Sequence, residues 1–97
     1  MKVRFTPRAA QDLIEIADYL NEQNPAAALR VRDAILRCVQ TLASFPEIGR
    51  KQSVAGVRKL PTRGFPYLIY YSLDSEADEI AVLTIRHAAR ARPYTDV

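Results

Sequence analysis

The stretch LPTRGFPYLIYYSLDSEADEIAVLTIRHAAR, residues 60–90, decides the fold. Its first run, Phe65 to Leu73, is rich in aromatic and aliphatic residues, and its second run, Glu79 to Ile85, is apolar at nearly every position. The segment DSEAD between them, residues 74–78, is polar and about as long as a hairpin loop. Strand propensity, flanking turn residues and loop length therefore all predict a β-hairpin.

The second strand of this hairpin is apolar on both faces. Because side chains alternate along a strand, we expect two sets on opposite faces: Ile80, Val82 and Thr84 on one, and Ala81, Leu83 and Ile85 on the other. Such a strand lies inside a sheet and is covered on at least one face. It is then expected to bring Arg86, His87 and Arg90 to one place.

Two helix-start signals precede the hairpin. Thr6-Pro7 and Asn24-Pro25 each place a capping side chain before a proline, which is favoured at the first helical position. The first helix is predicted to end at residues 22–24, and the second at Phe45, since the residue before Pro46 avoids the helical conformation. Apolar residues keep helical spacing in both: Ala9, Ala10, Leu13, Ile14, Ile16, Ala17 and Leu20, then Ala28, Val31, Ile35, Cys38, Leu42 and Phe45.

Two short strands, Lys2 to Phe5 and Val57 to Leu60, complete the pattern, while residues 47–56 are predicted to be irregular and residues 61–64 to form a turn. Helices joined by so short a link form an antiparallel pair, and neither can bury its apolar stripe alone. The sequence therefore predicts an α+β fold of order β-α-α-β-β-β, with the helix pair packed on a small, mostly antiparallel four-stranded sheet. Its 97 residues make a single domain, 1–97.

Composition argues against several classes of protein. No apolar run approaches the ~20 residues of a membrane span, and nothing after Met1 is predicted to be a signal peptide. The single cysteine, Cys38, cannot form an internal disulfide, which fits a reducing compartment and a cytoplasmic protein. The sequence holds no metal-ligand cluster, glycine-rich phosphate loop or Ser-His-Asp set, so we expect no metal and no cofactor.

Charge is unevenly distributed along the chain, whose net charge is +3. Residues 48–73 contain no acid but five bases: Arg50, Lys51, Arg58, Lys59 and Arg63. The acids of the first helix are expected on or near the side away from its apolar stripe: Asp12, Glu15, Asp18 and Glu22. A basic half of this kind attracts nucleic acid or an acidic protein partner. The alternative is a solvated surface with uneven charge.

The candidate functional side chains are mostly basic. His87, the only histidine, is the natural proton donor or acceptor, although a hydrogen-bonded structural histidine is the alternative. If the last three strands form a meander, four arginines lie close together: Arg58, Arg63, Arg86 and Arg90. Guanidinium groups bind phosphates or carboxylates through paired hydrogen bonds. Four tyrosines offer stacking surfaces or pack within the sheet: Tyr67, Tyr70, Tyr71 and Tyr94.

Five segments resemble the RelE/ParE superfamily of bacterial toxins, in the same order: TPRAAQDL (6–13), FPEIG (45–49), RKL (58–60), FPYLIYY (65–71) and IRHAAR (85–90). The resemblance covers almost the whole chain. It implies the toxin of a type II toxin–antitoxin module, with growth inhibition, plasmid stabilisation and neutralisation by an acidic, partly disordered antitoxin encoded alongside. ParE-like members act on DNA gyrase, whereas RelE-like members cut messenger RNA in the ribosome.

The chain departs from the RelE-like nuclease pattern. Tyr67 stands where those members tend to have an arginine, and the basic residue past the last strand is either Arg90 or replaced by Ala89. The His-Ala-Ala-Arg ending is similar to ParE-like members, so the resemblance favours a gyrase inhibitor, with a ribosome-dependent endoribonuclease as the alternative. A member that has lost its target is a third reading. The expected nuclease set is Arg86, His87, Arg90 and Tyr94; the expected target- or antitoxin-binding set is Arg58, Lys59, Arg63, Arg86, His87, Arg90 and Arg92.

Overall fold

The structure is a computed structural model that describes residues 1–90, with the backbone but not the side chain of Arg90. Arg92 and Tyr94, both predicted site residues, lie outside the described residues. The elements in chain order are β1 (Lys2–Phe5), α1 (Pro7–Gln23), α2 (Pro25–Ser44), β2 (Arg50–Lys51), β3 (Val57–Pro61), β4 (Tyr67–Asp74), β5 (Glu79–His87) and the 3₁₀ turn η1 (Ala88–Arg90).

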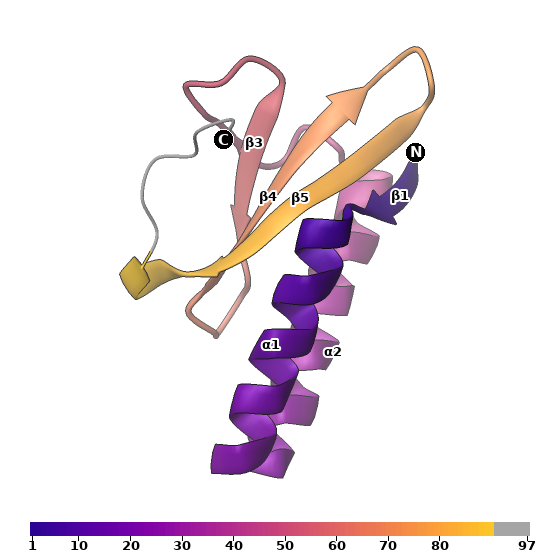
Figure 1. Cartoon of the computed structure of the whole chain (residues 1–97). Coiled ribbons are helices and arrows are strands. Elements are labelled where there is room, and N and C mark those ends of the chain that lie inside the picture. The colour runs from indigo at the N-terminus through magenta and orange to yellow at the C-terminus, as the bar shows by residue number, and fades with distance from the viewer. Residues whose placement is uncertain (91–97) are drawn as a thin grey trace.

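Both helices begin at the predicted caps. The Thr6 hydroxyl accepts a hydrogen bond from the Ala9 amide at 3.1 Å, and the Asn24 side chain accepts from the amides of Ala26 and Ala27 at 3.1 and 3.2 Å. These bonds satisfy amides that have no partner within a helix. The helices lie side by side and antiparallel, and the link between them points away from the sheet (Figure 1). Within residues 1–90, neither is long and apolar enough to cross a membrane.

The sheet has five strands in the order β1-β5-β4-β3-β2. β1 runs parallel to β5, and the other neighbours are antiparallel, so the predicted α+β fold is confirmed with one strand more than predicted. The extra strand, β2, falls in the segment predicted to be irregular. It pairs through only two residues, Arg50 with Lys59 and Lys51 with Arg58, which is too short to produce a periodic pattern.

The core lies between the helices and one face of the sheet. Its buried members are Ala9, Val31, Ile35, Leu42, Tyr67, Ile69, Tyr71, Ile80, Val82 and Ile85. Three residues of the predicted helical stripes are exposed: Ala10, Ile14 at 53% and Phe45 at 65%. Phe45 is the residue at which α2 ends, so its side chain leaves the seam that Leu42 follows. The prediction that Phe45 belongs to the core was therefore wrong.

A bulge in β5 changes which of its residues face the core. Tyr70 pairs with Thr84 and Tyr71 pairs with Val82, so Leu83 is an extra residue on β5. Such an insertion reverses the alternation of side chains beyond it. Ile85 consequently joins Ile80 and Val82 in the core. The predicted grouping of Ile85 with Ala81 and Leu83 was wrong for this reason.

Candidate functional site

The start of α1 takes over from β1 as the neighbour of β5. β1 pairs with β5 as far as Phe5 and Val82, and the chain then turns into the helix. The Thr6 amide donates to the Val82 carbonyl at 3.0 Å, and the Thr6 hydroxyl donates to the Leu83 carbonyl at 3.0 Å. The N-cap residue of α1 therefore bonds to the strand at the bulge.

Asp12 continues this contact nearly two turns further along α1. Its Oδ2 accepts hydrogen bonds from the Thr84 hydroxyl at 2.5 Å and the Ile85 amide at 3.1 Å, while its Oδ1 lies 3.5 Å from Nε of Arg8. The Asp12 side chain is only 14% exposed. The prediction that Asp12 lies on or near the side away from the apolar stripe did not include this contact, which arises because the strand edge left unpaired beyond β1 needs an acceptor.

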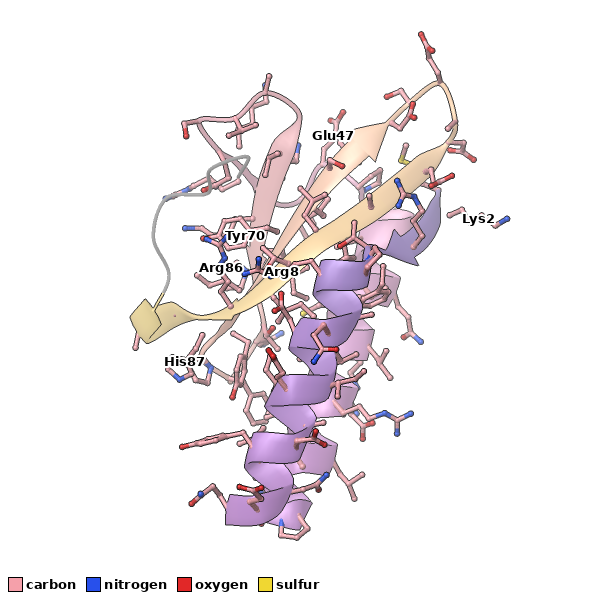
Figure 2. All side chains as sticks on the ribbon, viewed as in Figure 1. Lys2, Arg8, Glu47, Tyr70, Arg86 and His87 are labelled. Carbon is pink, nitrogen blue, oxygen red and sulfur yellow. The ribbon has the colours of Figure 1, made fainter. Side chains whose placement is uncertain are left out.

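Arg86 and Lys59 share the open face of the sheet, by which we mean the face opposite the core. Ile69 and Tyr71 are in the core, so Tyr70 between them points to the open face. Lys59 pairs with Tyr70 across β3 and β4. The guanidinium carbon of Arg86 lies 5.3 Å from the centre of the Tyr70 ring, a cation–π contact, and Figure 2 shows the two side chains together.

His87 points to the other face. It pairs with Tyr67, a core residue, and the two rings meet edge to face with centroids 5.4 Å apart. Its Nδ1 accepts a hydrogen bond from the Ala89 amide at 3.1 Å, so a neutral His87 carries its proton on Nε2. In Figure 2, His87 lies apart from Arg86 and Tyr70. The adjacent residues Arg86 and His87 are therefore not brought to one place.

Arg58 is bound by the segment that follows α2. Its Nη1 donates to the carbonyls of Glu47 at 3.0 Å and Gly49 at 2.8 Å. The Tyr71 hydroxyl bonds to the same segment, accepting from the Gly49 amide and donating to the Pro46 carbonyl, each at 2.8 Å. Burial raises the pKa of Tyr71 above 10.0, against the opposing effects of the Gly49 hydrogen bond and the Arg58 charge. Arg58 thus stabilises a turn, on the face opposite Lys59.

Two further basic residues are Arg63, beside the end of β5, and Arg8 of α1. Arg63 is exposed in the turn between β3 and β4, which meets the end of β5 where the Ala88 amide donates to the Pro66 carbonyl at 2.7 Å. Arg8, which sequence reasoning missed, approaches Thr84 through their shared partner Asp12. Its only sequence signal was an ordinary pairing with an acid four residues later. Among the described residues, no group of three or more His, Cys, Asp or Glu side chains could hold a metal ion.

Comparisons with known proteins identify the family of the chain. Residues 3–92 match the family described as the ParE toxin of the type II toxin–antitoxin system parDE. The putative toxin Y4kP of Sinorhizobium fredii is 34% identical over 95% of this chain and 93% of its own length. The toxin RelE2 of Caulobacter vibrioides is 38% identical over 92% and 97%.

Solved structures give the same result for the fold. A chain of the chromosomal ParDE toxin–antitoxin system from P. aeruginosa superposes with a TM-score of 0.77 at 29% identity, over 90% of this chain and 95% of that one. The isolated E. coli RelE toxin superposes with a TM-score of 0.67, over 93% and 86%, and at 16% identity it supports the fold alone.

Proposed function

Because the chain belongs to the family of ParE toxins of type II toxin–antitoxin systems, we propose that it inhibits DNA gyrase and that a cognate antitoxin neutralises it. The observation that carries the choice of gyrase is the separation of Arg86 from His87. Arg86 lies over Tyr70 on the open face, and His87 packs against Tyr67 on the core side.

This separation weighs against RNA cleavage. Attack by an RNA 2′-hydroxyl needs a proton acceptor, a proton donor and a positive charge directed at the same phosphate. The imidazole of His87 is instead engaged through Nδ1 with the Ala89 amide, on the face opposite the Arg86 guanidinium. Tyr67, where RelE-like members tend to have an arginine, is only 7% exposed.

The open face supplies the surface for a charged protein. Arg86 lies over the Tyr70 ring, and Lys59 pairs with Tyr70 across β3 and β4. Arg8 pairs with Asp12, which also bonds to Thr84 of β5. Guanidinium and ammonium groups beside an aromatic ring can bind the carboxylates of an acidic protein segment through charge and hydrogen bonds. We propose that this face contacts gyrase and that the antitoxin covers part of it.

The helix pair supplies a second surface for the antitoxin. Ile14 and Leu29 are 53% and 61% exposed, and an apolar hollow lies between α1 and α2. Its lining consists of Leu13, Ile14, Ile16, Ala17, Ala28, Val31 and Arg32. An amphipathic segment of the antitoxin that folds on contact would bury these residues.

A ribosome-dependent endoribonuclease is the second candidate, and one observation favours it. Two curated relatives from Caulobacter vibrioides, 38% and 30% identical to this chain, bear the name RelE. This activity would require four side chains to converge on the scissile phosphate: Arg86, His87, Arg90 and Tyr94. The side chains of Arg90 and Tyr94 lie outside the part of the chain that the structure describes.

One experiment separates the two candidates. The purified chain, alone and with its antitoxin, is added to gyrase with relaxed plasmid and, in parallel, to translating ribosomes with a mapped messenger RNA. We expect loss of supercoiling, restored by antitoxin, and uncut RNA. The His87→Ala variant should retain inhibition, whereas Arg86→Ala should lose it; Arg30→Ala, on the exposed face of α2, is the matched control. Full supercoiling together with toxin-dependent RNA cuts would overturn the proposal.

A further inference from the structure

The bulge in β5 determines the face on which Arg86 lies. Ile80 and Val82 face the core, so unbroken alternation would also send residues 84 and 86 toward the core. The extra residue Leu83 shifts this phase, and Ile85 faces the core instead. Arg86 is thereby placed on the open face, over the Tyr70 ring. Without the bulge, the Arg86 side chain would be directed at the helices.

The bulge is held from the side by two residues of the α1 start. Thr6 bonds to the Val82 and Leu83 carbonyls, each at 3.0 Å. Asp12 accepts hydrogen bonds from the Thr84 hydroxyl and the Ile85 amide. Thr84 and Ile85 are the two residues that precede Arg86. Bulges bend a strand and leave part of its ladder unpaired, and these bonds replace the missing pairs.

We infer that Asp12 is a positioning residue for Arg86: its carboxylate fixes the bulged end of β5 and so holds the guanidinium on the open face. This inference rests on the proposed function, in which Arg86 contacts the target. Asp12 is suited to the task because it is 14% exposed and one of its oxygens accepts two hydrogen bonds, while the other pairs with Arg8. Hydrogen bonds to a charged acceptor are stronger than those between neutral groups.

Removal of the carboxylate leaves the Ile85 amide without its acceptor. In Asp12→Ala, the segment from Thr84 to His87 is no longer tied to α1, although the core residues of β5 remain in place. We expect growth arrest by the chain expressed without antitoxin to need at least about tenfold more toxin, because two hydrogen bonds to a charged acceptor are lost. Asp18→Ala removes the same charge from an exposed position of α1 and should leave growth arrest unchanged.

Two conservative variants keep the hydrogen bonds. Asp12→Asn can keep one oxygen as acceptor for both the Thr84 hydroxyl and the Ile85 amide, while its NH2 group replaces the oxygen beside Arg8. Thr84→Ser retains the hydroxyl, whereas Thr84→Val removes it with little change of shape. We expect Asp12→Asn and Thr84→Ser to behave like the unsubstituted chain, and Thr84→Val to behave like Asp12→Ala. Equal growth arrest by Asp12→Ala and the unsubstituted chain, at matched amounts of folded protein, would overturn the inference.

A double substitution separates positioning from general stability. Arg86→Lys keeps a positive charge but cannot make the same planar contact, so we expect it to weaken growth arrest without abolishing it. If Asp12 acts through Arg86, Asp12→Ala should weaken growth arrest much less in the Arg86→Lys background, while lowering the melting temperature equally in both. An equal loss of growth arrest in both backgrounds would contradict a positioning role.

A measurement without toxicity distinguishes failure of this inference from failure of the proposed function. In folded Asp12→Ala, amide hydrogen exchange should accelerate at Ile85 but not at Ile69, and the proton contacts between Arg86 and Tyr70 in NMR spectra should weaken. If exchange and contacts are unchanged, the inference fails, whatever the target. If they change while the unsubstituted chain does not inhibit gyrase, the proposed function fails and the positioning of Arg86 stands.

Discussion

Tyr70 and Tyr71 are consecutive in β4 and almost fully buried, at 2% and 0% exposure, yet they lie on opposite faces of the sheet. Tyr71 packs in the core, and its hydroxyl bonds to the turn at residues 46–49. Tyr70 lies outside the core cluster, beneath Arg86. The core face is fixed by close packing and satisfied hydrogen bonds, whereas the open face carries cations on an aromatic support. Substitutions on the core face should therefore change stability, and those on the open face should change binding.

The largest effect is expected from Leu42→Ala on the core face. Leu42 is fully buried, so its loss should lower the free energy of unfolding by about 2–5 kcal/mol through lost burial and a residual cavity. Denaturant unfolding measures this. Phe45→Ala is the control, because Phe45 is 65% exposed and its replacement should change stability by about 0.5 kcal/mol or less. Similar losses for both would contradict the position of the core.

Gly49→Ala tests how closely the turn packs on Tyr71. A Cβ atom at Gly49 would lie 2.5 Å from the Tyr71 hydroxyl oxygen and 3.0 Å from the Lys59 carbonyl oxygen. Such overpacking should cost about 1–3 kcal/mol of unfolding free energy. Ser53→Ala, at an exposed position in the link between β2 and β3, should be nearly neutral in thermal and denaturant unfolding. A stable Gly49→Ala variant with the Tyr71 bonds intact would show that the turn is free to move.

Tyr71→Phe should have a similar or slightly smaller effect. It leaves the Gly49 amide and the Pro46 carbonyl without their partner, which should cost about 1–3 kcal/mol. Its pH dependence identifies the cause. The pKa of Tyr71 in the native state exceeds its unfolded value of 10.0, so the unfolded state loses the proton first and stability falls as the pH rises above 10.0.

Tyr71→Phe removes the contribution of the Tyr71 hydroxyl to the loss of stability at high pH. Unfolding measured from pH 8 to about pH 11 should therefore show a smaller loss of stability for Tyr71→Phe than for the unsubstituted chain, since the other titrating groups are common to both. Parallel pH profiles would mean that Tyr71 does not carry the shifted pKa.

The smallest effect on stability is expected from the open face. Arg86→Ala removes one cation–π contact and should lower the free energy of unfolding by about 1 kcal/mol or less. Under the proposed function it should nevertheless abolish growth arrest, measured in the same strain at equal toxin levels. A loss of stability as large as that of Leu42→Ala would remove the distinction between the two faces.

Local signals were sufficient to predict most of the fold. Thr6-Pro7 and Asn24-Pro25 give the helix starts, because a cap and a fixed proline dihedral act within a few residues of themselves. The bulge was not predicted. β5 is apolar on both faces, so its hydrophobic pattern does not specify which face is buried. A shift of one residue does not change that pattern, and the bulge therefore cannot be read from it.

The candidate site was harder to predict than the fold. Arg86 and His87 are adjacent in sequence, and alternation in a strand already implied opposite faces for them and for Arg58 and Lys59. The concentration of basic residues in the sequence therefore does not become one cluster in space, because neighbouring residues of a strand face opposite sides. The role of Asp12 had no local signal, because it arises where β1 ends and β5 continues without a neighbour.

The position of β5 between β1 and β4 also affects how the chain is made. β1 is synthesised first but pairs with the last strand, so the sheet cannot close while residues 79–87 are still inside the exit tunnel. At about 5–20 residues per second, the nascent N-terminal strand and both helices wait a few seconds for their central strand. The sheet therefore gains its finished surface only after β5 has been synthesised, which gives a neutralising partner already present in the cell time to reach it.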